Sequence, residues 1–161
     1  MADHEPKHWE LWSEDRAEAI IAARSAEPGA TLPILHDLQA VFGCVPAEAV
    51  PLLAQSLNVT RAEVHGVVSF YHEFRRHPPG RHILRLCRAE ACQALGCESL
   101  AEHVRSRLNI DWHETTSDGT VTLEPVFCLG LCTIGPSALL DGEPLGVLSP
   151  ATIDAALDAL T

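Results

Sequence analysis

Two short stretches decide how this chain is interpreted: Cys87-Arg88-Ala89-Glu90-Ala91-Cys92 and Cys128-Leu129-Gly130-Leu131-Cys132. The first places four residues between its cysteines, the second places three, and 35 residues separate the two pairs. Two loops that each supply two thiolates can surround one four-coordinate centre. Thiolate is a soft donor and favours an iron–sulfur cluster, zinc or copper(I) over hard cations. An iron–sulfur centre would make the chain an electron carrier, whereas zinc would make it a structural module.

Each cysteine pair follows a predicted strand. In residues 82–86, polar and apolar side chains alternate enough to predict a strand that runs into Cys87. Residues 120–126 are predicted to form a second strand, which ends beside Cys128. We therefore expect the two loops to meet at one edge of a sheet. Gly130 allows the second loop to curl around a centre and present N–H groups to sulfur, which stabilises the charge added on reduction.

The remaining cysteines are Cys44 and Cys97. If Cys92 and Cys97 lie on one helix, five residues rotate them by about 500°, which leaves them roughly 140° apart. They cannot then both face one centre. The shorter loop from Cys87 suits a chelate, so we favour Cys92 as the ligand and expect Cys97 to be a packed thiol. Cys44 is expected to be a small core residue.

The composition excludes several functional classes. The chain has 161 residues, 47% of them hydrophobic, and a net charge of −11 with Lys7 as its only lysine. Such a surface repels nucleic acid and anionic membranes. The polar first ten residues show no signal peptide, and no stretch is long and apolar enough to span a bilayer. We expect a cytoplasmic protein, in which cysteines indicate metal binding rather than disulfides.

The first half of the sequence reads as helical and the second half as mixed α/β. Ser13 and Thr31 are expected to cap helices, Thr60 begins a capping box with Glu63, and Ser149 precedes a proline at a helix start. The predicted helices cover residues 13–24, 31–42, 47–57, a short segment from 60, 94–108 and 149–160. The predicted strands cover 82–86, 110–116 and 120–126 around Ser117-Asp118-Gly119, and 137–140 and 145–148 around residues 141–144.

These motifs together resemble a known family: the thioredoxin-like [2Fe–2S] subunit of respiratory complex I, NAD-linked hydrogenases and NAD-dependent molybdenum formate dehydrogenases. Phe42-Gly43-Cys44-Val45-Pro46 matches its aromatic-Gly-x-x-Pro turn, and Ser69-Phe70-Tyr71 matches its Ser-Phe-Tyr segment. The resemblance spans roughly residues 15–160. It implies an α+β protein, with an N-terminal helical bundle over 1–80 and a thioredoxin-like α/β domain with a mixed sheet over 81–161. It also implies four cluster ligands: Cys87, Cys92, Cys128 and Cys132.

The loop Arg88-Ala89-Glu90-Ala91 is most similar to that of formate dehydrogenase gamma subunits, since complex I versions tend to carry Thr and Gly there. This resemblance implies an electron-transfer subunit, non-catalytic alone, beside the FMN of a partner subunit that binds NAD. A further iron–sulfur subunit and a molybdenum subunit would complete the complex. The equivalent subunit of complex I or of an NAD-linked hydrogenase is the alternative.

Two other classes stay open from the residues alone. A zinc-bound adaptor would use the same four thiolates for structure only. A thiol oxidoreductase is disfavoured because the chain lacks a short C-x-x-C motif.

Two further features have competing interpretations. Five of the ten arginines lie between residues 75 and 88, either as a solvated basic face or, near Cys87, to stabilise a reduced cluster or dock a partner. Trp9 and Trp12 are predicted to dock on another subunit; the alternatives are that they pack on their own domain or are disordered.

Overall fold

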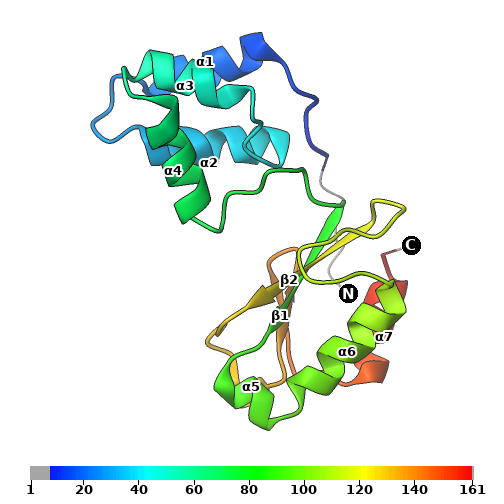
Figure 1. Ribbon diagram of the computed structural model, residues 1–161. Helices are drawn as coiled ribbons and strands as arrows, with labels where there is room; N and C mark the ends of the chain where they lie inside the picture. The colour runs from blue at the N-terminus through cyan, green and yellow to red at the C-terminus, as the bar shows by residue number, and fades with distance from the viewer. Residues whose placement is uncertain (1–7, 161) are drawn as a thin grey trace. The chain divides into compact units, whose positions relative to one another are not determined.

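The computed structural model describes residues 8–160, which divide into two compact units, His8–Pro78 and Pro79 onward (Figure 1). The N-terminal part of the chain before His8 lies outside the described residues. Among the helices of the described part, none is both long and apolar enough to cross a membrane.

The first unit consists of helices. Ser13 caps the first helix as predicted, because its Oγ accepts a hydrogen bond from the Arg16 N–H at 3.4 Å. Thr60 and Glu63 form the predicted capping box. The prediction that Thr31 caps a helix was wrong, since Thr31 is already helical and follows Ala30 without a side-chain cap. The helices are α1 (Glu14–Arg24), α2 (Thr31–Phe42), α3 (Ala49–Ser56) and α4 (Arg61–Phe70).

One apolar core holds this unit together. Helix α1 packs against α2 and α3, and α4 packs against α2 and α3. The largest fully buried side chains at the centre are Ile34, Leu35, Leu38, Phe42, Leu53 and Val64.

Both tryptophans of the first unit pack on that unit. The Trp12 ring lies 5.3 Å from the Phe42 ring, centroid to centroid. Trp9 lies against Gly43, whose φ is +75° and where a Cβ atom would meet the Trp9 ring at 2.7 Å. The structure therefore shows the alternative in which Trp9 and Trp12 pack on their own domain.

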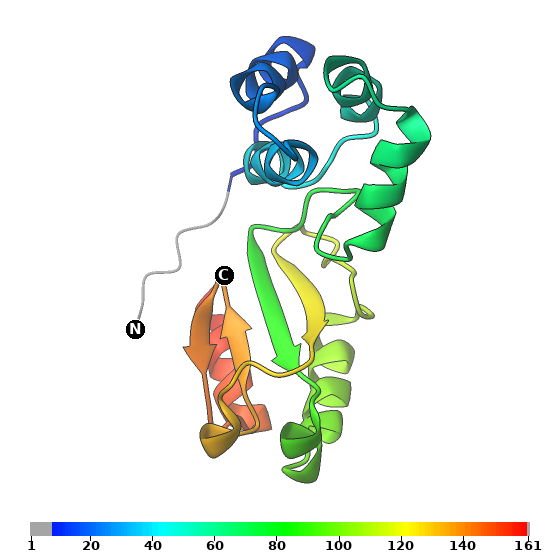
Figure 2. The ribbon, with the colours of Figure 1, turned by 90° about the vertical axis from the view of Figure 1, so that its left-hand side faces the viewer.

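The second unit is built on a mixed sheet in the order β2-β1-β3-β4. Strand β1 (His82–Cys87) pairs in parallel with β2 (Val121–Val126) and antiparallel with β3 (Ala138–Leu140), which pairs antiparallel with β4 (Glu143–Leu145). Parallel strands need a long crossover, which here contains α5 (Glu90–Ala94) and α6 (Cys97–Leu108). Helix α7 (Pro150–Asp158) ends the fold, and α6 and α7 lie on the same face of the sheet (Figures 1 and 2). The α+β expectation is confirmed.

The core of the second unit begins with a row of leucines across three strands. Leu84 on β1 pairs with Leu123 on β2 and with Leu140 on β3, and all three are at most 1% exposed. Val104 of α6 and Ile153 of α7 belong to the same cluster. This row lies three residues before Cys87, so it anchors the strand from which the first cysteine projects.

Three sequence expectations differ from the structure in this unit. Residues 110–116 are not a strand, because His113 has a φ of +66° and only Thr115 forms a bridge, with Thr122. The predicted helix 94–108 begins only at Cys97, because Gly96, with a φ of +86°, separates it from α5, a short helix that was not predicted. The last strand begins at Glu143 rather than 145, because Asp141 and Gly142 alone make the turn, both with positive φ.

Candidate metal centre

Cys87 and Cys92 are held by the end of β1 and by the short helix α5. Both are buried. The Cys87 N–H donates to the Ser137 carbonyl at 3.0 Å, and the Arg88 N–H donates to the Val126 carbonyl at 2.8 Å. The start of the first cysteine loop is thereby fixed to the neighbouring strands on both sides.

Cys128 and Cys132 come from the loop that follows β2. Cys128 and Gly130 have φ values of +83° and +73°, so the chain curls tightly between the two cysteines. The Gly130 N–H points back to the Cys128 Sγ at 3.4 Å, as the glycine was expected to allow. Both cysteines are exposed, in contrast to the buried first pair.

The two loops meet at the Cys87 thiol. Burial alone would raise its pKa, but hydrogen bonds from the N–H groups of Ala89, Cys128 and Leu129 and from the Cys92 thiol lower the pKa below its ordinary value. Donors from both loops thus converge on one sulfur and favour its thiolate form. This is the charge state in which cysteine binds metal.

The fourth cysteine lies close to the other three. The negative charge on Cys128, the hydrogen bond with its thiol, and the charges on Cys92 and Cys87 raise the pKa of Cys132. The structure therefore brings together the four cysteines predicted from the sequence. Binding to a cationic centre is the ordinary way to relieve such repulsion between thiolates.

Cys97 is nearer to this group than we expected from the sequence. It is buried in one cluster with Cys87 and Cys92, and burial raises the pKa of its thiol. The condition of a single helix is not met, because Cys92 lies on α5 and Cys97 begins α6. Cys44, by contrast, is a buried residue of the helical unit, and burial raises the pKa of its thiol.

The donor set consists of two pairs of thiolates, one buried and one exposed, from two loops. A structural zinc site needs four ligands around one point, whereas a [2Fe–2S] centre spreads four thiolates over two irons. Within residues 8–160, no three side chains of His, Cys, Asp or Glu are placed so that one ion could bind them all. Two pairs of thiolates from two loops are the donor set that a [2Fe–2S] centre uses.

Several residues that the sequence did not single out complete the surroundings. The Ser137 Oγ lies 3.7 Å from the Cys92 Sγ. A Cβ atom at Gly135 would lie 2.8 Å from Leu95 and 3.5 Å from the Cys92 sulfur, so only glycine fits there without displacement. The closeness of Gly135 to a cysteine sulfur is a tertiary feature that the sequence does not indicate.

Arg88, inside the first cysteine loop, does not carry an unbalanced charge. Its guanidinium donates to Glu98 at 2.8 and 3.0 Å and lies 5.0 Å from the centre of the Trp112 ring. Its carbonyl accepts a hydrogen bond from the Gln93 side chain at 3.0 Å. One residue thus connects the cysteine loop to α5, to α6 and to the segment after α6.

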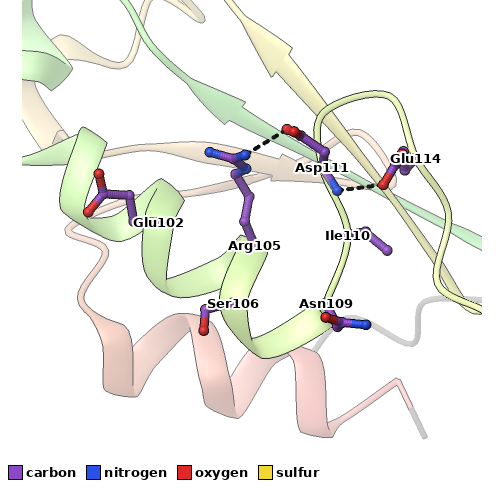
Figure 3. A pocket seen from close by; sticks show the side chains of 7 residues that line it. All are labelled: Glu102, Arg105, Ser106, Asn109, Ile110, Asp111 and Glu114. Atoms are coloured by element: carbon purple, nitrogen blue, oxygen red, sulfur yellow. Dashed lines mark hydrogen bonds and ion pairs between the residues drawn. The ribbon is translucent and has the colours of Figure 1, made fainter.

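The second unit also carries a hollow of about 430 Å³ that contains no cysteine (Figure 3). Arg105 extends across it to Asp111 at 2.9 Å, and the Asp111 N–H donates to Glu114. The other lining residues are Glu102, Ser106, Asn109 and Ile110. Arg105, Asp111 and Glu114 are bonded to one another there, and the four cysteines of the two loops are the stronger candidate site.

Comparison with protein families adds an independent finding. The family of thioredoxin-like [2Fe-2S] ferredoxins matches residues 17–161. This match covers both the helical unit and the sheet unit.

Individual relatives agree with this match. One subunit of the NADH-quinone oxidoreductase of Pseudomonas aeruginosa is 35% identical over 130 residues, which cover 81% of this chain and 78% of that protein. The HndA subunit of the NADP-reducing hydrogenase of Solidesulfovibrio fructosivorans is 30% identical, over 83% of this chain and 78% of its own length.

Among solved structures, an NAD+-reducing [NiFe]-hydrogenase in the air-oxidized state is similar, with a TM-score of 0.68 and 26% identity. The similar region covers 81% of this chain but only 22% of the hydrogenase chain.

Proposed function

The chain belongs to the family of thioredoxin-like [2Fe-2S] ferredoxins, and from this premise we propose that it is an electron-transfer subunit of an NAD-linked oxidoreductase complex. It would carry one [2Fe–2S] cluster beside the FMN of a partner subunit that binds NAD. The observation that carries the proposal is the packing of the second cysteine loop on the first. Leu129 lies against the buried cluster that contains Cys87 and Cys92, and N–H groups of both loops lower the pKa of Cys87.

Cys87, Cys92, Cys128 and Cys132 would hold the cluster. When bound, the cluster accepts and releases one electron at a time. The buried pair shields one side of the site from water, while Cys128 and Cys132 place the other side at the surface. Electrons would therefore enter and leave on the side of the second loop. The N–H groups directed at sulfur stabilise negative charge on the ligands.

The protein itself makes and breaks no bonds in this proposal. It positions the ligands, excludes water and sets the reduction potential. The helical unit and the sheet unit would be separate domains of one subunit. We place the complex in the cytoplasm, where reducing conditions keep thiols available; all six cysteines are free of disulfides in the structure.

For the parent complex we propose an NAD-dependent formate dehydrogenase with a further iron–sulfur subunit and a molybdenum subunit. The support is the loop Arg88-Ala89-Glu90-Ala91, which resembles the gamma subunits of those enzymes. A complex I or an NAD-linked hydrogenase is the second candidate, and the names of the similar proteins favour it.

Purification of the native complex through a tag on this chain tests the proposal. Under anaerobic conditions the complex would be given NADH, formate or hydrogen in turn, and the cluster signal followed by electron paramagnetic resonance. Reduction by formate and NADH, with bound molybdenum, is expected. Reduction by hydrogen with bound nickel, or by NADH alone with quinone as acceptor, would replace formate dehydrogenase by the second candidate. A cluster that no donor reduces in the intact complex would contradict electron transfer altogether.

A further inference from the structure

Arg88 and Glu98 form an ion pair that adjoins the cysteine group from two sides. Arg88 follows Cys87 directly, and Glu98 follows Cys97 directly, at the start of α6. Two of the guanidinium nitrogens reach the carboxylate at distances of 2.8 to 3.2 Å. Such a two-point contact fixes the relative orientation of both side chains.

The arginine of this pair also contacts an aromatic ring. Trp112, which packs on the core of the sheet unit, covers the guanidinium at 5.0 Å. The Arg88 side chain is 28% exposed and that of Glu98 is 47% exposed. Interactions of such charges with their neighbours are partly screened by water and salt, but they are not abolished.

The two charges of the pair have opposite electrostatic effects on the cysteine group. The Glu98 carboxylate and the Arg88 guanidinium each interact electrostatically with the Cys97 thiol. Cys97 is packed against Cys87 and Cys92, two of the four proposed ligands. Charges that reach Cys97 are therefore close enough to affect a cluster held by its neighbours.

We propose that the Arg88–Glu98 pair, held by Trp112, is a balanced charge pair that sets the reduction potential of the cluster. This inference rests on the proposed function. Reduction adds one negative charge to the cluster, so a nearby positive charge raises the potential and a nearby negative charge lowers it. Because the two charges of the pair compensate each other, the removal of either one leaves the other unbalanced beside the site.

The proposal gives shifts of opposite sign for two single variants of the full-length chain. Glu98→Gln leaves the arginine uncompensated and is expected to raise the reduction potential. Arg88→Gln leaves the carboxylate uncompensated and is expected to lower it. The double variant is expected to return close to the wild-type value, and added salt is expected to reduce both single shifts.

The experiment is a redox titration, monitored by electron paramagnetic resonance, of the wild type, the two single variants and the double variant. Arg107→Gln is the matched control, since it makes the same change in net charge but removes the partner of Asp154 and Asp158 at the other end of α6. Its potential is expected to equal that of the wild type. Arg88→Lys keeps the charge without the two-point contact and is expected to keep the potential while the cluster is lost faster to a chelator.

A purely structural role would loosen the loop in both single variants and move both potentials in the same direction or not at all. Either result overturns the inference. Failure of the proposed function is distinguishable, because wild-type protein without iron and sulfide would give no signal to titrate. If Arg88→Gln does not fold, the rise predicted for Glu98→Gln still decides the question. Its control is then Asp154→Asn, which makes the same change in net charge beside Arg107 and should show no rise.

Discussion

Replacement of Leu84 by alanine tests how the sheet supports the cysteine site. Leu84 is fully buried at the centre of the leucine row and lies three residues before Cys87. The change removes three carbon atoms, which is about 2.4 kcal/mol of transfer free energy at about 0.8 kcal/mol for each. Both neighbouring strands are hydrogen-bonded to β1 and limit its relaxation. The remaining cavity therefore raises the expected loss to about 3–4 kcal/mol, within the range for buried leucines.

The assay combines two measurements on the cluster-loaded, full-length protein. Urea unfolding followed by circular dichroism gives the loss of stability, and the decay of visible absorbance in the presence of an iron chelator gives the rate of cluster loss. Leu53→Ala is the matched control, because Leu53 is equally buried but belongs to the core of the helical unit. We expect Leu84→Ala alone to accelerate cluster loss.

Two results would refute this reasoning. A loss of stability well below about 1 kcal/mol for Leu84→Ala would show that the leucine row relaxes around the missing carbons. Equal acceleration of cluster loss by Leu53→Ala would show that the site depends on overall stability rather than on the strand that carries Cys87.

Three further predictions concern single residues. Thr60→Ala removes the capping box of α4 and should cost about 1 kcal/mol in urea unfolding, whereas Thr60→Ser should be close to neutral. Gly43→Ala forces a side chain into positive φ and against the Trp9 ring, and should cost about 1–3 kcal/mol; an unchanged melting temperature would contradict this. Hydrogen bonds from the side chains of Thr116 and Thr120 hold the pKa of Asp118 far below its usual range. Because the pKa of Asp118 is lowered in the folded protein, its ionised carboxylate contributes its full stabilisation above the ordinary pKa of about 3.9. That stabilisation decreases as the pH falls below this value. Asp118→Asn should therefore be less stable than wild type at pH 6, with the difference shrinking towards pH 3.

Features that depend on local chemistry were predictable from the sequence. The serine and threonine caps at Ser13, Thr60 and Ser149 mark helix starts because their oxygens accept the free N–H groups of the first turn. The Asp141-Gly142 pair is also a local signal, and its preference for a two-residue turn would have placed β4 correctly. We expected four residues in that turn, which shifted the predicted strand.

Features that depend on tertiary contacts were not predictable. Gly96 separates α5 from α6, so Cys92 and Cys97 do not share one helix and Cys97 packs in the cysteine group. His113 adopts a left-handed conformation that no preference of histidine for strands or helices indicates. The pairing of Arg88 with Glu98 and Trp112 joins segments up to 24 residues apart. The four candidate ligands themselves were proposed from spacing and resemblance.

Iron and acid-labile sulfide analysis, followed by electron paramagnetic resonance after dithionite reduction, tests the central claim most directly. We predict about two irons and two sulfides for each chain, with a one-electron signal of spin one-half. Cys128→Ser should lose or alter the signal, while Cys97→Ser should keep it. A colourless wild-type protein with bound zinc, or a centre that requires Cys97 but not Cys128, would contradict the claim that these four cysteines hold an electron-transfer cluster.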